Sequence, residues 1–171
     1  MGAGQRHELR TIAGIGLSSC FLLAACAARP PERDVVRDPF PTEQGEVART
    51  VRAILEAART KDLDRLEAFH LYGPKFTKFD DGGPPGREDA ETAKKAERAG
   101  LGGLKAFRPA VEDLKVDVFG PVAVATFFLR YEIETAREIV SGKSRSTLVF
   151  VREGGAWKIA HEHHSPFREN P

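Results

Sequence analysis

Three of the five histidines stand together near the C-terminus, in His161-Glu162-His163-His164. The surrounding stretch 157–165 is predicted to be a strand, in which successive side chains point to opposite faces. His161 and His163 are then expected on the face of Ile159, and Glu162 and His164 on the other. A β-bulge would exchange these assignments. Acid–base chemistry by His161 and His163 is therefore one hypothesis for this strand.

Other roles for the histidines stay open. Two histidines spaced by two on a strand can ligate one metal if a third ligand comes from elsewhere. No third ligand stands out, so we predict neither a metal nor a cofactor. Structural, partly buried histidines are the plainer alternative. A neutral imidazole, His164 included, can also bind a polar group inside an apolar cavity.

A second candidate is the Asp80-Asp81 pair, which follows a short predicted strand and precedes Gly82-Gly83-Pro84. A carboxylate at the rim of a pocket can have its pKa raised by desolvation and then accept a proton from carbon. The same residue types also form ordinary turns. Both interpretations of the pair remain open.

The N-terminus carries features of a targeting signal. Arg6 and Arg10 precede the uncharged stretch 11–25, which at about 15 residues is too short to span a bilayer as a helix. Its end, Leu23-Ala24-Ala25-Cys26, resembles the bacterial lipobox, in which the cysteine is acylated. The resemblance implies a lipid on Cys26 that attaches the chain to the membrane of the cell envelope. An ordinary secretory signal, cut after Ala25 or Ala27, is the alternative.

Composition excludes several other classes of function. Cys20 would leave with the signal peptide and Cys26 would become a thioether, so the mature chain would have no free thiol for a disulfide, a zinc site or a nucleophile. Beyond residue 25 the acidic and basic side chains are equal in number. With no basic stripe, nucleic acid is not an expected partner. After Cys26, Ala27 and Ala28 stand where such lipoproteins carry an aspartate if they are retained in the inner membrane. This favours the outer membrane as the location of the chain.

The rest of the chain predicts one α+β domain. Helical spacing begins after Thr42, the expected N-cap, and a second helix begins after Asp62. A short strand near 76–79, a charged helix over 87–98 and four strands in an antiparallel meander come next. The predicted divisions are a signal peptide (1–25), a proline-rich tether (26–41), a folded domain (42–167) and a tail (168–171).

The order of these elements, the Phe79-Asp80-Asp81-Gly82 loop and the closing Trp157-to-Ser165 strand together resemble the SnoaL-like division of the nuclear transport factor 2-like superfamily. The resemblance covers about 43–167. It implies a cone-shaped, cystatin-like fold with helices packed on a curved sheet, often forming homodimers. The superfamily includes isomerases, cyclases, dehydratases and non-catalytic members, so the fold alone does not determine the function.

The resemblance also directs attention to particular residues. Asp80 and Asp81 lie close to the position of the general base of ketosteroid isomerase, but the first predicted helix lacks the tyrosine which that enzyme's oxyanion hole requires. The candidate pocket residues are Tyr131, Arg145, Thr147 and His164. The expected function is non-catalytic binding of a small apolar ligand or a partner. An enzyme with an Asp/His acid–base pair and a dimeric scaffold are the alternatives.

Overall fold

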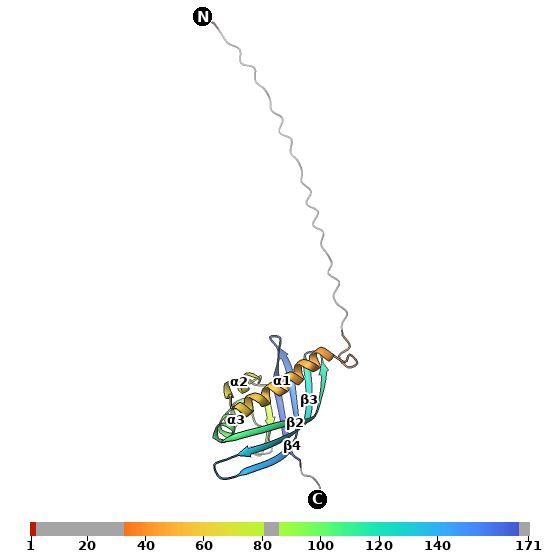
Figure 1. Cartoon of the computed structure of the whole chain (residues 1–171). Helices are drawn as coiled ribbons and strands as arrows, with labels where there is room; N and C mark the ends of the chain where they lie inside the picture. The colour runs from red at the N-terminus through yellow and green to blue at the C-terminus, as the bar shows by residue number, and fades with distance from the viewer. Residues whose placement is uncertain (3–32, 81–85, 168–171) are drawn as a thin grey trace. The chain divides into compact units, whose positions relative to one another are not determined.

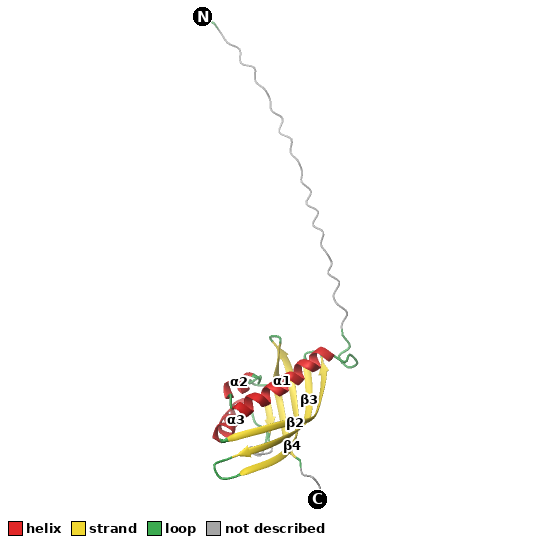
Figure 2. Ribbon diagram, viewed as in Figure 1, coloured by secondary structure: helices red, strands yellow, loops and turns green. Residues whose placement is uncertain are grey.

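The computed structural model describes residues 1–2, 33–80 and 86–167. The chain divides into two units, 1–32 and 33–171, and the helices and strands belong to the second. Cys26 and Asp81 lie outside the described residues, as do residues 3–25 of the predicted signal peptide. The fold is α+β, with helices on one face of a curved, mixed five-stranded sheet (Figures 1 and 2). No helix among the described residues is long and apolar enough to cross a membrane.

Helix α1 (Pro41–Thr60) lies across the sheet (Figure 1) and buries one of its own faces against it. Its buried side chains, among them Val47, Val51 and Ile54, recur at the spacing expected of an amphipathic helix. The predicted N-cap, Thr42, is wrong. The helix begins after Phe40, and Pro41 occupies a first-turn position, where its fixed φ and missing N–H are no disadvantage.

The two shorter helices begin at aspartates. The Asp62 carboxylate accepts a hydrogen bond from the Arg65 backbone N–H and caps α2 (Leu63–Ala68), as predicted. The Asp89 carboxylate caps α3 (Ala90–Gly103) in the same way. The third helix therefore begins and ends later than the predicted 87–98.

The sheet has the strand order β1-β5-β4-β3-β2. Its four long strands form the predicted antiparallel meander, whereas the short β1 pairs in parallel with β5. The pairing places Lys78 opposite Glu162. The strands are β1 (Thr77–Phe79), β2 (Ala106–Phe119), β3 (Val122–Glu134), β4 (Ile139–Glu153) and β5 (Ala156–Pro166).

An extra residue in β5 exchanges the faces that simple alternation assigns to the histidines. Val149 of β4 pairs with His161, but the next residue pairs with Ile159, which leaves Ala160 as a bulge. Glu162 and His164 consequently share the inner face of Ile159 and line a cavity beneath the helices. The expectation that His161 and His163 share the face of Ile159 is wrong.

Candidate functional site

A cavity of about 440 Å³ lies between the helices and the inner face of the sheet, within the size range of small-molecule pockets. Leu55, Leu101 and Leu104 line it from the helical side, and Phe127 and Leu129 from the sheet. The polar residues of the lining include a cluster of charged side chains. An apolar chamber with a few polar groups is typical of a binding site for a small organic molecule.

Lys78 is at the centre of this charged cluster. Its Nζ lies 2.7 Å from Glu97 Oε1, 3.0 Å from Glu162 Oε2 and 3.4 Å from Asp80 Oδ2. Lys78, Glu97 and Glu162 come from β1, α3 and β5, so the cluster connects three separate elements of the fold, and Asp80 directly follows β1. Lys78 is only 5% exposed, and a buried ammonium needs such compensation.

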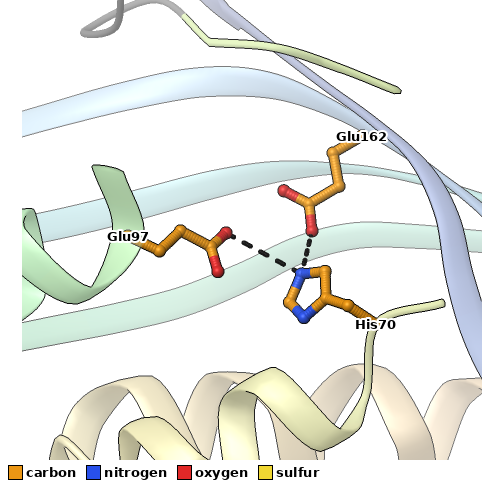
Figure 3. Close-up of side chains that lie close together, drawn as sticks. All are labelled: His70, Glu97 and Glu162. Atoms are coloured by element: carbon orange, nitrogen blue, oxygen red, sulfur yellow. Dashed lines mark hydrogen bonds and ion pairs between the residues drawn. The ribbon is translucent and has the colours of Figure 1, made fainter. Parts of the chain in front are cut away.

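His70 is the second cation of the cluster (Figure 3). The flanking backbone fixes its position, because the Leu71 N–H donates to the Ile159 carbonyl at 2.8 Å. The ring Nδ1 lies 3.0 Å from the carbonyl oxygen of Leu66 and must donate to it, because that oxygen only accepts. Nε2 contacts a carboxylate oxygen of Glu162. Both ring nitrogens therefore face acceptors, which is the arrangement of an imidazolium.

The electrostatics agree with this assignment. Burial opposes a charge on His70, but the hydrogen bond to Glu162 and the charges of Glu162 and Glu97 raise the pKa of His70 above its ordinary value. Burial likewise opposes the charge on Lys78, and the neighbouring carboxylates raise its pKa well above the ordinary value. Against its own burial, Glu162 has its pKa lowered well below the usual range by Lys78, His164 and His70. Lys78 and Glu162 therefore both stay charged at neutral pH.

Aromatic rings support the cluster from one side. Tyr72 stacks on His70 with ring centroids 4.7 Å apart, and Phe76 packs edge-on against both rings. The Tyr72 hydroxyl donates to Glu97 Oε2 at 3.0 Å. Burial and the charge of Glu97 raise the pKa of Tyr72, which keeps the hydroxyl protonated as a donor.

His70, Glu97 and Glu162 bring three potential metal-ligating atoms within 4.8 Å of one another. The Lys78 ammonium, however, already contacts both carboxylates. It occupies the position in which a divalent cation would neutralise them. The donor set as it stands therefore fits an internal ammonium better than a metal ion.

Glu88 differs from the other acids of the cavity. Its backbone forms two hydrogen bonds with that of Lys78, of 2.9 and 3.1 Å, which fix it beside β1. Its side chain lines the cavity, yet both carboxyl oxygens are buried without a hydrogen-bond partner among residues 33–80 and 86–167. The residue is only 3% exposed. Burial raises the pKa of Glu88, although Lys78 opposes the shift.

The cavity brings together some of the residues singled out from the sequence. Asp80, Tyr131 and His164 line it, and the His164 ring also contacts Ser146, with Nδ1 2.9 Å from Oγ. Arg145 and Thr147 are not among the lining residues. Arg145 is exposed and donates to the carbonyl oxygen of Pro166 at 3.0 Å.

His161 and His163 lie away from the cavity. The ring of Phe79 packs edge-on against each of them, with centroid separations of 6.2 and 5.9 Å. His161 Nδ1 is also 2.8 Å from the Thr77 hydroxyl oxygen. These contacts give the two histidines structural partners between β1 and β5. Asp81 belongs to the segment outside the described residues.

Sequence reasoning did not select His70, Lys78, Glu88 or Glu97 as site residues. Lys78 lies in the short predicted strand beside Thr77, where alternation alone does not mark it as buried. His70 lies at the end of an amphipathic segment, and Glu97 lies within a charge run that is typical of a solvated helix face. Only tertiary packing distinguishes these residues from surface positions.

The helix-backed curved sheet, with a pocket on its inner face, defines this molecule as a pocket domain of the nuclear transport factor 2-like fold. A family described as the SnoaL-like domain matches residues 47–169, which is most of the chain. The chain belongs to the SnoaL-like domain family. No protein of curated function matches its sequence significantly.

Solved structures support the same fold. A Streptomyces avermitilis protein, provisionally named a dehydratase of the nuclear transport factor 2-like family, is 20% identical with a TM-score of 0.67, over 75% of this chain and 98% of its own. A superfamily member from Salmonella enterica is 17% identical with a TM-score of 0.66, over 76% and 94%. A provisionally named scytalone dehydratase from Novosphingobium aromaticivorans is 13% identical with a TM-score of 0.62, over 74% and 85%.

Proposed function

We propose that the SnoaL-like domain binds a small, largely apolar molecule in its cavity, with the polar end of that molecule directed toward the charged cluster. The single observation that carries this proposal is the cavity of about 440 Å³, which combines apolar walls with a few charged groups. Apolar burial would supply most of the affinity. The polar groups would set the orientation and the specificity.

Binding fits the His70–Glu162 pair better than catalysis does. Both ring nitrogens of His70 already face protein acceptors. Glu162 is held as a carboxylate by Lys78 and His70, and its lowered pKa makes it a weak base. Neither group is free to exchange a proton with a ligand, so the pair serves as a structural ion cluster.

An acid–base enzyme of isomerase, cyclase or dehydratase type is the second candidate, and Glu88 is the observation that favours it. An unpartnered carboxyl with a raised pKa, facing an apolar cavity, has the properties of a general base. Asp80 lines the same cavity. In this version Glu88 takes the proton-transfer role that the sequence suggested for Asp80 or Asp81 and a histidine.

The binding proposal can be tested with uncharged apolar probes. The purified full-length chain is screened by thermal shift against medium-chain alcohols, phenylalkanols and naphthols, since a bound ligand raises the melting temperature. Two matched variants locate the site. Ala96 and Ala99 are both exposed residues of α3, but only Ala96 lines the cavity.

We expect Ala96→Trp to abolish the stabilisation and Ala99→Trp to retain it. If no probe stabilises the chain, or if both variants respond alike, the cavity is not the binding site. Turnover of a bound probe by the wild type and its loss in Glu88→Gln would instead favour the enzyme.

We also propose that the chain is a lipoprotein of the bacterial envelope, anchored through Cys26 and facing the periplasm. The support is the Leu23-Ala24-Ala25-Cys26 motif after a short apolar stretch. Cys26→Ala should abolish labelling by a radioactive fatty acid and release the chain from the membrane fraction, and Cys20→Ala is the matched control. Unchanged labelling in Cys26→Ala would refute the anchor.

Homodimer formation is a separate prediction. Sedimentation analysis of the purified chain would test it.

A further inference from the structure

The lining of the cavity contains more acidic than basic groups. Among the described residues its acids are Asp80, Glu88, Glu97 and Glu162, and the groups able to carry a positive charge are Lys78, His70 and His164. Even with both histidines protonated, four ionised carboxylates exceed the available cations by one. With neutral histidines the excess is larger. In a chamber with apolar walls such an excess is costly.

Glu88 is the group at which the excess is located. Lys78 lies between Glu97, Glu162 and Asp80, and His70 lies against Glu162 and Glu97. Glu88 lines the same space, and neither of its oxygens has a hydrogen-bond partner in the part of the chain that the structure describes. No described side chain neutralises it, so a proton or a cation from outside the protein would relieve the excess charge.

We infer that the cavity takes an organic ammonium, a molecule with an apolar body and a protonated primary amine, whose N–H groups donate to the Glu88 carboxylate. This inference rests on the proposed binding function and names its ligand class. The apolar residues would enclose the body, and the ammonium would replace the proton on Glu88. Charge-assisted hydrogen bonds of this kind are stronger than neutral ones.

The alternative occupant of the same place is a neutral ligand oxygen that accepts a hydrogen bond from protonated Glu88. The two alternatives differ in their response to pH. Because an ammonium must displace a proton from Glu88, its affinity rises with pH over the range in which Glu88 titrates. A neutral acceptor needs that proton, so its affinity falls with pH over the same range.

The test compares two probes that share one body, 4-phenylbutylamine and 4-phenylbutanol. Isothermal titration of the full-length chain at neutral pH should show the amine binding at least about tenfold more tightly than the alcohol. Glu88→Gln keeps the shape of the side chain and removes its charge, so it should reduce this preference to about one. Glu91→Gln, an exposed position three residues away, should leave the preference intact.

The outcomes distinguish the inference from the function on which it rests. Equal or tighter binding of the alcohol refutes the ammonium inference and leaves the binding function standing. Equal loss of the preference in Glu91→Gln attributes it to general surface charge, which also refutes the inference. If neither probe binds while the uncharged panel does, only the ligand class is wrong. If nothing binds at all, both proposals fall.

Discussion

The substitution Lys78→Met tests most directly whether the charged cluster stabilises the fold. Methionine has a similar length and can fill the same space, but it removes the cation from the centre of the cluster. Glu97 and Glu162 would then lose the partner that lies 2.7 and 3.0 Å from them. Glu162 is only 4% exposed, so water cannot replace the lost interaction.

The expected cost is large because one partner of a buried ion pair is removed while the other stays buried. Such changes destabilise a protein by about 3–5 kcal/mol. A domain of this size loses roughly 3–4 °C of melting temperature for each kcal/mol. Lys78→Met should therefore lower the melting temperature by on the order of 10–20 °C. Lys75→Met is the matched control, because Lys75 is exposed and lies three residues away.

The pH dependence separates this electrostatic effect from a packing defect. The pKa of Glu162 is lowered in the folded protein, so its contribution to stability is present above its unfolded value, near 4.5, and is lost as the pH falls through the folded value. In Lys78→Met that contribution loses its largest favourable part, and only the part due to His164 and His70 stays. The difference in unfolding free energy between the wild type and Lys78→Met should thus be largest at neutral pH and smaller in acid.

Urea unfolding followed by circular dichroism, at neutral and acidic pH, measures both quantities. A loss below about 1 kcal/mol at neutral pH would mean that the ammonium is no better than a methyl group at that position. A loss of the same size at every pH would assign the effect to packing. Either result refutes a stabilising role for the charges of the cluster.

Three further predictions use the same unfolding assay. The pKa of His70 is raised above its ordinary value of 6.5, so its contribution to the free energy of unfolding is complete below that pH and is lost as the pH rises through the folded value. His70→Asn should remove this pH dependence of the unfolding free energy. In Gly142→Ala the new Cβ would clash with the Tyr131 ring, which should cost about 1–3 kcal/mol. Gly100→Ala, with open space in α3, should instead stabilise the protein by about 0.5–1 kcal/mol. Glu88→Met should stabilise at neutral pH by about 1–3 kcal/mol, because it removes a buried carboxyl with no hydrogen-bond partner among the described residues. Because the pKa of Glu88 is raised, this gain should shrink as the pH falls through the folded value and be lost below the unfolded value, near 4.5. A loss of stability at neutral pH would show that the carboxyl has a structural partner.

Much of the fold can be predicted from the sequence because local patterns determine it. The 3.6-residue spacing of Val47, Val51 and Ile54 specifies α1, and the Asp62 cap specifies the start of α2. Alternation and glycine-containing turns specify the meander of long strands. The parallel pairing of the three-residue β1 with β5 has no such local signal, since it joins segments about 80 residues apart.

The candidate site is harder to predict from the sequence than the fold, and the reason is physical. Alternation assigns faces correctly only while the strand is regular, and the bulge at Ala160 reverses the assignment for every later residue of β5. The residues around Ala160 carry no sequence signal that predicts the bulge. The cluster also depends on contacts between β1, α3 and the segment after α2, so a residue such as Glu97 acquires its role only in the folded domain.

The ion cluster and Glu88 have different roles that depend on each other. A strand of three residues has few backbone hydrogen bonds, so the buried pairing of Lys78 with Glu162 also specifies its register against β5. A slip by one residue would turn Lys78 to the opposite face. Because the backbone of Lys78 also holds that of Glu88, the same pairing fixes an unpartnered carboxyl at the wall of the cavity. The satisfied charges therefore position the unsatisfied one, and a mutation in the cluster should alter ligand affinity through Glu88 even where the ligand never contacts the mutated residue.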